Sequence, residues 1–381
     1  MTRALRLTGA QVLTSSGLIE TPLYLDGGAI VDACKGRQID LSGFWIMPGI
    51  VDVHGDAFEK HLAPRRGAMK SLDLGLMATE AELASNGITT GTLAQFYSWE
   101  GGMRGPEFAR QVFEALEDVR PRVDTTLTTQ LRFETHMLED YDAILKMIER
   151  FGITFMVFND HLPHDALAKG KTPPGHVGKS LKAGFNPDKN LERLKAMHAA
   201  RDRVPGALQA LAPKLAEMGV RMGSHDENTP EQRQWWHDLG ARICEFPETI
   251  ATAEAAKSMG NAVIMGSPNL VRGGSHKGNV SAVDVVSMGH VDALASDYHY
   301  PSLRRAAFLL ADSGVCDLAG AWRMISEGPA KVLGLYDRGR LESGQRADLV
   351  VIDPQTRDIC VTIAGGRVTY MRGEAGERFL A

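Results

Sequence analysis

Apolar stretches along the chain repeatedly have the length and flanking residues of buried strands, and helical patterns separate most of them. We predict eight strands, at residues 46–54, 88–95, 126–134, 153–160, 220–225, 241–246, 261–266 and 292–297. Helical spacing of apolar residues predicts helices at residues 72–86, 106–119, 140–151 and 249–259. Helix C-caps are expected at Gly87, Gly152, Gly219 and Gly260, each of which also precedes a strand. This alternation predicts an α/β fold, a (β/α)₈ TIM barrel, with its active site at the carboxyl ends of the strands.

The two ends of the chain show a different pattern, in which short strands alternate with turns. Strands are expected at residues 10–13, 23–25 and 29–31, and β signals return after Pro329 at 347–353, 361–363 and 366–368. We expect these two sets to pair. Residues 1–46 and 336–381 would then form a small composite β-sandwich domain, and residues 47–335 would form the barrel.

The connection between residues 161 and 205 is too long for a simple barrel loop. It contains no clear strand and carries Lys169, Lys171, Lys179 and Lys182. Long loops in compact domains are usually functional or disordered. We therefore predict a basic loop, which either closes over phosphates or is a solvated surface insertion.

The first barrel strand ends in His54-Gly55-Asp56. Two residues apart on an extended chain, His54 and Asp56 point to the same side. An imidazole and a carboxylate at one strand end suit a divalent metal, although an isolated pair of this kind is more often part of a polar loop.

Other predicted strands also end in potential ligands, and this favours the metal site. The predicted ligands are His54, Asp56, Glu134, His161, His225 and Asp297, with Asp160 beside them. We expect one or two divalent ions, with Zn²⁺ first and Mn²⁺, Fe²⁺ or Ni²⁺ as alternatives. Glu134 would bridge two ions, and Asp297 would be the catalytic base. The other histidines, such as His136 and His198, are assigned to the surface or to positions behind the ligands.

Basic and glycine-rich segments predict an anion site at the same rim. Glycines beside cationic side chains let backbone N–H groups and charges surround phosphate, although glycine-rich loops are common. The predicted substrate-binding residues are Lys60, His61, Arg65, Asn269, Arg272, Ser275, His276 and Asn279. We therefore expect a phosphorylated small molecule as the substrate.

Composition narrows the class of protein. The chain has 381 residues, of which 44% are hydrophobic and 23% charged, as in ordinary globular proteins. A net charge of -5 argues against a general nucleic-acid binder. The four cysteines form no C-x-x-C pair, and the chain has neither a signal-like apolar segment nor a membrane-length apolar run. A cytoplasmic protein without a membrane partner is expected. A non-catalytic barrel is a further alternative, disfavoured because the candidate ligands are all present.

At this point the residues resemble a known family. The patterns Pro48-Gly49-x-x-Asp52-x-His54, Ser296-Asp297 and Gly344-x-x-Ala347-Asp348 resemble the amidohydrolase superfamily. More narrowly, the chain resembles the PhnM family of phosphonate catabolism in the segments around His54-Gly55-Asp56, Asn159-Asp160-His161, Ser224-His225-Asp226, Glu245-Phe246-Pro247 and Arg272-Gly273-Gly274-Ser275-His276.

The resemblance implies an activity and partners. PhnM enzymes are diphosphatases that hydrolyse α-D-ribose 1-methylphosphonate 5-triphosphate to the 5-phosphate and pyrophosphate. Carbon–phosphorus lyase pathway proteins would be partners, and a homo-oligomer, a dimer, is expected. The sequence departs from the superfamily pattern in having no second histidine on strand one, no strand-four lysine and no strand-six histidine. An amide hydrolase or deacetylase acting on a phosphorylated sugar is therefore the alternative function.

Overall fold

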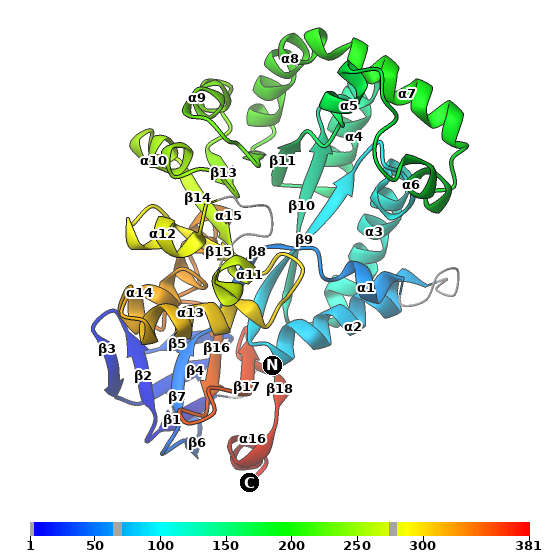
Figure 1. The fold of residues 1–381 in the computed structure, drawn as a ribbon. Coiled ribbons are helices and arrows are strands. Elements are labelled where there is room, and N and C mark those ends of the chain that lie inside the picture. Colours follow the sequence, from blue (N-terminus) through cyan, green and yellow to red (C-terminus); the bar gives the residue numbers. More distant parts are fainter. Residues whose placement is uncertain (1–3, 64–70, 274–279) are drawn as a thin grey trace. The chain divides into compact units, whose positions relative to one another are not determined.

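The computed structural model describes residues 4–63, 71–273 and 280–381 (Figure 1). They divide into two compact units. The first comprises Met1–Leu93, Leu116–Thr128 and Ala262–Ala381, and the second comprises Ala94–Ala115 and Thr129–Asn261.

An eight-stranded sheet has a strand at each of the eight predicted positions, the first of them only from Ile50 onward. Its order is β15-β14-β13-β12-β11-β10-β9-β8, so strands that follow one another in the chain are also neighbours in the sheet. The bounds are β8 Ile50–Gly55, β9 Ile88–Tyr97, β10 Thr126–Glu134, β11 Phe155–Asn159, β12 Arg221–His225, β13 Ile243–Glu245, β14 Ala262–Gly266 and β15 Ala293–Ala295. A parallel bridge joins Gly55 to Asp297, so the first strand also meets the segment after the last. This confirms the predicted barrel.

The predicted barrel helices form at the expected places. Observed bounds are α2 Leu72–Ser85, α3 Pro106–Val119, α4 Tyr141–Phe151 and α10 Ile250–Ser258, each within one residue of the prediction. Gly152 adopts a left-handed conformation after α4, with φ 60° and ψ 41°, as its C-cap role requires. Other helices are α1 Glu59–Leu62, α8 Val204–Glu217, α9 Pro230–Asp238, α11 Ser267–Arg272, α12 Ala282–Ser287, α13 Ser302–Asp312, α14 Leu318–Arg323 and α15 Glu327–Leu333.

Strands from both ends of the chain form two further sheets within the first unit. One has the order β5-β4-β1-β6 and the other β18-β17-β16-β7-β2-β3, so C-terminal strands pair with N-terminal ones (Figure 1). Their bounds are β1 Leu5–Thr8, β2 Gln11–Thr14, β3 Gly17–Glu20, β4 Leu23–Asp26, β5 Ala29–Val31, β6 Arg37–Asp40, β7 Trp45–Pro48, β16 Leu349–Ile352, β17 Ile359–Ala364 and β18 Arg367–Met371, followed by α16 Gly373–Leu380.

A shared apolar core joins these two sheets. Leu7 and Leu25 of one sheet belong to the same buried cluster as Val12, Ile46 and Val351 of the other. In β1 and β4 buried side chains alternate with more exposed ones, and the buried side faces this core, as in the expected small β-sandwich. The boundaries proposed for it, residues 1–46 and 336–381, stay a prediction.

The first predicted barrel strand, 46–54, is in fact two strands. Strand β7 ends at Pro48 and pairs with β16, whereas β8 begins at Ile50 and pairs with β9. The chain passes from one sheet to the other at Gly49. A Cβ atom there would lie 2.4 Å from Thr89 Oγ1 and 3.1 Å from the carbonyl carbon of Asp348, so only glycine fits.

The predicted basic loop at 161–205 is also wrong, because most of it is helical. It contains α5 His164–Ala168, α6 His176–Lys182 and α7 Pro187–Ala199 in the second unit. Asn186 caps α7 by accepting a hydrogen bond from the Lys189 backbone N–H at 3.0 Å. Leu162, Leu167 and Leu194 pack with Trp99 in a small apolar cluster. The individual helices are too short for a clear apolar period, and this packing stabilises them.

Among residues 4–63, 71–273 and 280–381, every helix is too short or too polar to span a lipid bilayer.

Candidate metal centre

Three predicted ligands meet in the first unit. His54 lies on β8, Asp56 follows that strand, and Asp297 follows β15. One donor atom from each lies within 4.8 Å of the other two. The Asp297 N–H donates to the His54 carbonyl at 2.9 Å, and the Asp56 N–H donates to the Asp297 carbonyl at 2.9 Å. One imidazole and two carboxylates fixed in this way suit a divalent metal.

A buried carboxylate, Asp52, supports this strand end. It accepts hydrogen bonds from the backbone N–H and hydroxyl of Ser296, at 3.0 and 2.5 Å. Burial raises the pKa of Asp52, and the hydrogen bonds from Ser296 oppose that rise. A Cβ on Gly55 would lie 2.6 Å from Asp52 Oδ2 and 2.8 Å from the Tyr300 ring. The glycine between His54 and Asp56 is therefore required by packing.

In the second unit, Glu134 and His161 contact each other. Glu134 ends β10 and is fully buried. Its carboxylate accepts from the His161 backbone N–H at 3.0 Å and from Trp99 Nε1 at 3.2 Å, and lies 2.5 Å from His161 Nδ1. Among the described residues, Glu134 belongs to no group of three potential ligands within 4.8 Å. Its bridging role stays a prediction.

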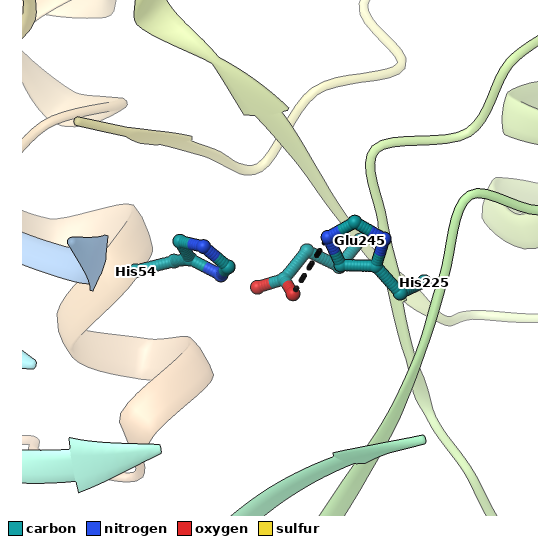
Figure 2. A group of neighbouring side chains, drawn as sticks. All are labelled: His54, His225 and Glu245. Atoms are coloured by element: carbon teal, nitrogen blue, oxygen red, sulfur yellow. Dashed lines mark ion pairs between the residues drawn. The ribbon is translucent and has the colours of Figure 1, made fainter. Parts of the chain in front are cut away.

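His225, at the end of β12, is surrounded by charged groups. Its Nδ1 lies 3.1 Å from Asp226 Oδ1, and its Nε2 lies 3.9 Å from Glu245 Oε2, the ion pair dashed in Figure 2. Arg132 Nη2 donates to the same Nε2 at 3.1 Å. Because a guanidinium only donates, Nε2 carries the lone pair in this arrangement and Nδ1 carries the proton. Burial lowers the pKa of His225, which favours the neutral ring that binds metal.

The second unit therefore holds its own group of ligands, formed by His161, His225 and Asp226, whose donor atoms lie within 4.8 Å of one another. The sequence prediction missed Asp226 and Glu245 as candidate ligands. Glu245 could have been found, because it ends a strand just as the predicted ligands do. The contact to Asp226 depends on a turn that sequence spacing does not reveal.

Backbone strain marks three of these strand ends. Asp226, Phe246 and Asp297 have φ values of 58°, 55° and 55°, in the left-handed region that non-glycine residues rarely adopt. Each follows a barrel strand at its carboxyl end. Strain of this kind concentrates at active sites, where the surrounding structure holds it in place.

Two of the predicted phosphate contacts share an unforeseen partner, Glu82 of α2. Lys60 Nζ lies 2.6 Å and His61 Nε2 2.5 Å from its carboxylate. Burial raises the pKa of Glu82, but the hydrogen bonds from Lys60 and His61 outweigh it, and the pKa lies below its usual value. The Lys60 side chain is 54% exposed, so its ammonium still has donors that face solvent.

Two other predicted phosphate-binding residues, Asn269 and Arg272, lie on α11. Arg272 Nη1 donates to the Tyr298 hydroxyl at 2.8 Å, next to Asp297 in the chain. The Asn269 carboxamide oxygen instead accepts the Ala282 N–H at 3.2 Å, so it holds the local backbone. The predicted contacts Arg65, Ser275, His276 and Asn279 lie outside the described residues.

Comparison with known proteins identifies the family. The chain is 32% identical over 323 residues to α-D-ribose 1-methylphosphonate 5-triphosphate diphosphatase of Escherichia coli (strain K12), covering 83% of this chain and 85% of that protein. The chain belongs to the PhnM family of the amidohydrolase superfamily. The Amidohydrolase family also matches residues 195–370. This confirms the resemblance inferred from the sequence motifs.

Further matches include another curated protein and solved structures of the same fold. An adenine deaminase of Brucella anthropi is 24% identical over 360 residues, covering 90% of this chain and 54% of that protein. A putative prolidase from Bifidobacterium longum superposes with a TM-score of 0.65 at 15% identity, covering 98% of this chain and 96% of that one. A structure described as a Xaa-Pro dipeptidase with bound methionine gives 0.66 at 12% identity, covering 97% and 100%.

Amidohydrolases generally bind divalent metals, and the residues of this chain fit that requirement. Each unit presents imidazole and carboxylate donors within 4.8 Å of one another at strand ends. That donor set suits Zn²⁺ and other borderline divalent ions.

Proposed function

We propose that this enzyme hydrolyses α-D-ribose 1-methylphosphonate 5-triphosphate to the 5-phosphate and pyrophosphate, with one or two divalent metal ions. The observation that carries the proposal is the 32% identity, over 83% of the chain, to a diphosphatase of that name. The ligand set proposed from the sequence is His54, Asp56, Glu134, His161, His225 and Asp297. These residues follow parallel strands of one barrel-type sheet, whose carboxyl ends form the active-site rim in this fold.

A bound divalent ion would supply Lewis-acid activation of water and of the phosphorus centre. Asp297 takes the proton of the attacking water. Its backbone donates a hydrogen bond to His54 and accepts one from Asp56, so the residue is held at the strand end before substrate binds. Geometry fixed in advance lowers the barrier, because no reorganisation is needed during the reaction.

Cationic side chains bind the triphosphate. Arg272 and Lys60 bind phosphate oxygens and stabilise the departing pyrophosphate. Tyr298 contacts Arg272, and Glu82 contacts Lys60. Arg132 is a further candidate, because it is buried over the Phe96 ring, 3.9 Å from its centroid, and donates to His225 Nε2. A metal that takes this nitrogen would leave the guanidinium to donate to a phosphate oxygen. Carbon–phosphorus lyase proteins would supply the substrate and use the product.

Product analysis tests the proposal. Purified protein with a divalent metal should release pyrophosphate, and in ¹⁸O-labelled water the label should enter only the ribose 5-phosphate product. Label in pyrophosphate would place the attack on the β-phosphorus, and release of orthophosphate alone would place it on the terminal one. Either result would overturn the bond assignment.

The alternative is an amine-releasing or amide hydrolase acting on a phosphorylated sugar. The similarity to proteins named adenine deaminase favours keeping it. Release of ammonia or free amine from phosphorylated amides, without pyrophosphate from the triphosphate, would establish the alternative in place of the diphosphatase.

A further inference from the structure

A further cluster of potential metal ligands lies in the second unit, and none of its members belongs to the predicted ligand set. It is formed by His136 after β10, Asp160 after β11 and His164 at the start of α5. His164 Nε2 lies 3.2 Å from both oxygens of Asp160, and His136 Nδ1 lies 3.3 Å from Oδ1. The sequence prediction assigned His136 to the surface or to a place behind the ligands. Its side chain is only 6% exposed, so it does not lie at the surface.

These separations match a metal site. Ligands at about 2.0 to 2.2 Å from a tetrahedral ion lie about 3.3 to 3.6 Å from each other. The imidazole–carboxylate distances of 3.2 and 3.3 Å are close to that spacing. The two histidine donors lie within 4.8 Å of each other. Two imidazoles and one carboxylate suit a borderline transition metal better than Mg²⁺ or Ca²⁺.

Hydrogen bonds orient two of the three residues, His164 and Asp160. His164 Nδ1 lies 2.8 Å from His198 Nδ1, so the ring nitrogen that faces away from Asp160 has a hydrogen-bond partner. The Leu162 backbone N–H donates to Asp160 Oδ1 at 3.2 Å. Metal-binding histidines normally have such a partner on the second nitrogen, and it fixes both tautomer and ring orientation.

A cavity borders one of the three residues, and another of them is partly exposed. A cavity of ≈ 390 Å³ is lined by His136 together with Met137, Arg193 and Met197. The Asp160 side chain is 46% exposed, so a water molecule can complete the coordination. His136 and Asp160 follow β10 and β11, and His164 lies on α5. The contact between His164 and His198 adds the end of α7 to this group.

We propose that His136, Asp160 and His164 bind a second divalent transition metal, separate from the catalytic centre, and that His198 positions His164. The bound ion fastens the inserted helices α5 and α7 to the ends of β10 and β11. The site does not depend on which reaction the enzyme catalyses.

Cobalt titration of the full-length metal-free protein tests this site. Co²⁺ in a tetrahedral site absorbs visible light, and calorimetry in parallel counts the equivalents bound. Wild type should bind one more equivalent than His164→Gln or Asp160→Asn, with a matching loss of absorbance. The His290→Gln variant, which changes a histidine of the first unit, is the matched control and should bind as wild type does.

His198→Gln separates positioning from ligation. It should keep the number of equivalents but weaken the second site about 10- to 100-fold, as expected when an outer hydrogen-bond partner is lost. Circular dichroism checks that each variant is folded, and Asp160→Asn, which keeps the side-chain shape, is the fallback for a misfolded His164→Gln. Equal equivalents and equal absorbance in wild type, His164→Gln and Asp160→Asn would overturn the proposal and leave a hydrogen-bonded cluster.

Discussion

Replacing Arg233 with methionine tests whether a buried ion pair holds the end of β12. Arg233 and Glu227 have side chains only 0% and 2% exposed, and Arg233 Nη1 lies 2.8 Å from Glu227 Oε1. The same nitrogen donates to Ser224 Oγ at 2.9 Å, and Nη2 donates to the Ala241 carbonyl. Ser224 directly precedes His225, so this network also fixes a predicted ligand.

The magnitude follows from the burial. Removing one partner of a buried ion pair leaves the other charge uncompensated, which costs about 3–5 kcal/mol. Methionine fills much of the same volume, so loss of packing adds little. Replacing Glu227 by methionine as well removes the stranded charge, and the double variant should regain about 2 kcal/mol relative to Arg233→Met.

Urea unfolding followed by circular dichroism, with a chelator in every sample, measures these free energies. Arg221→Met changes an exposed arginine on the same strand and should stay within about 0.5 kcal/mol of wild type. A loss below about 1 kcal/mol for Arg233→Met, or strictly additive losses in the double variant, would refute the reasoning.

Three further outcomes are expected. Gly49→Ala should lower the free energy of unfolding by about 1–3 kcal/mol in urea denaturation, because its Cβ would clash with Thr89. Adding Thr89→Ala should restore part of this loss, and no restoration would contradict the proposed cause. Arg272→Ala should raise KM about tenfold to a hundredfold at unchanged metal content, because a charged hydrogen bond to phosphate is lost; loss of metal, measured by elemental analysis, would make Arg272 structural. Asp297→Asn should keep its metal while turnover falls about 10²- to 10⁴-fold, and retained turnover would move the base to another residue.

Barrel strands such as β11 and β13 were predictable from sequence because each is a short apolar run that ends in a polar residue. A buried strand needs such a run, and a polar residue at its end is costly unless it is used. This reasoning located His54, Glu134 and His225 at strand ends, where the structure places them. The glycine at 152 likewise predicted the end of α4, because a left-handed C-cap favours that residue.

Tertiary structure decided what local pattern could not. The break at Gly49 arises because the two halves of one apolar run pair with strands of different sheets. Helices α5 and α7 pack in the apolar cluster around Trp99, which local periodicity does not reveal. The Glu82 side chain contacts those of Lys60 and His61, which lie 22 and 21 positions earlier in the chain.

The clearest contrast lies in the histidines. Sequence treated His136 and His198 as peripheral, since neither ends a predicted strand. The structure brings them together with Asp160 and His164, although His198 lies 34 positions after His164 in the chain. A sequence records which donors exist and which lie at strand ends. Only the folded chain decides which donors share one space, because a ligand set depends on distances of a few ångströms between residues that are far apart along the backbone.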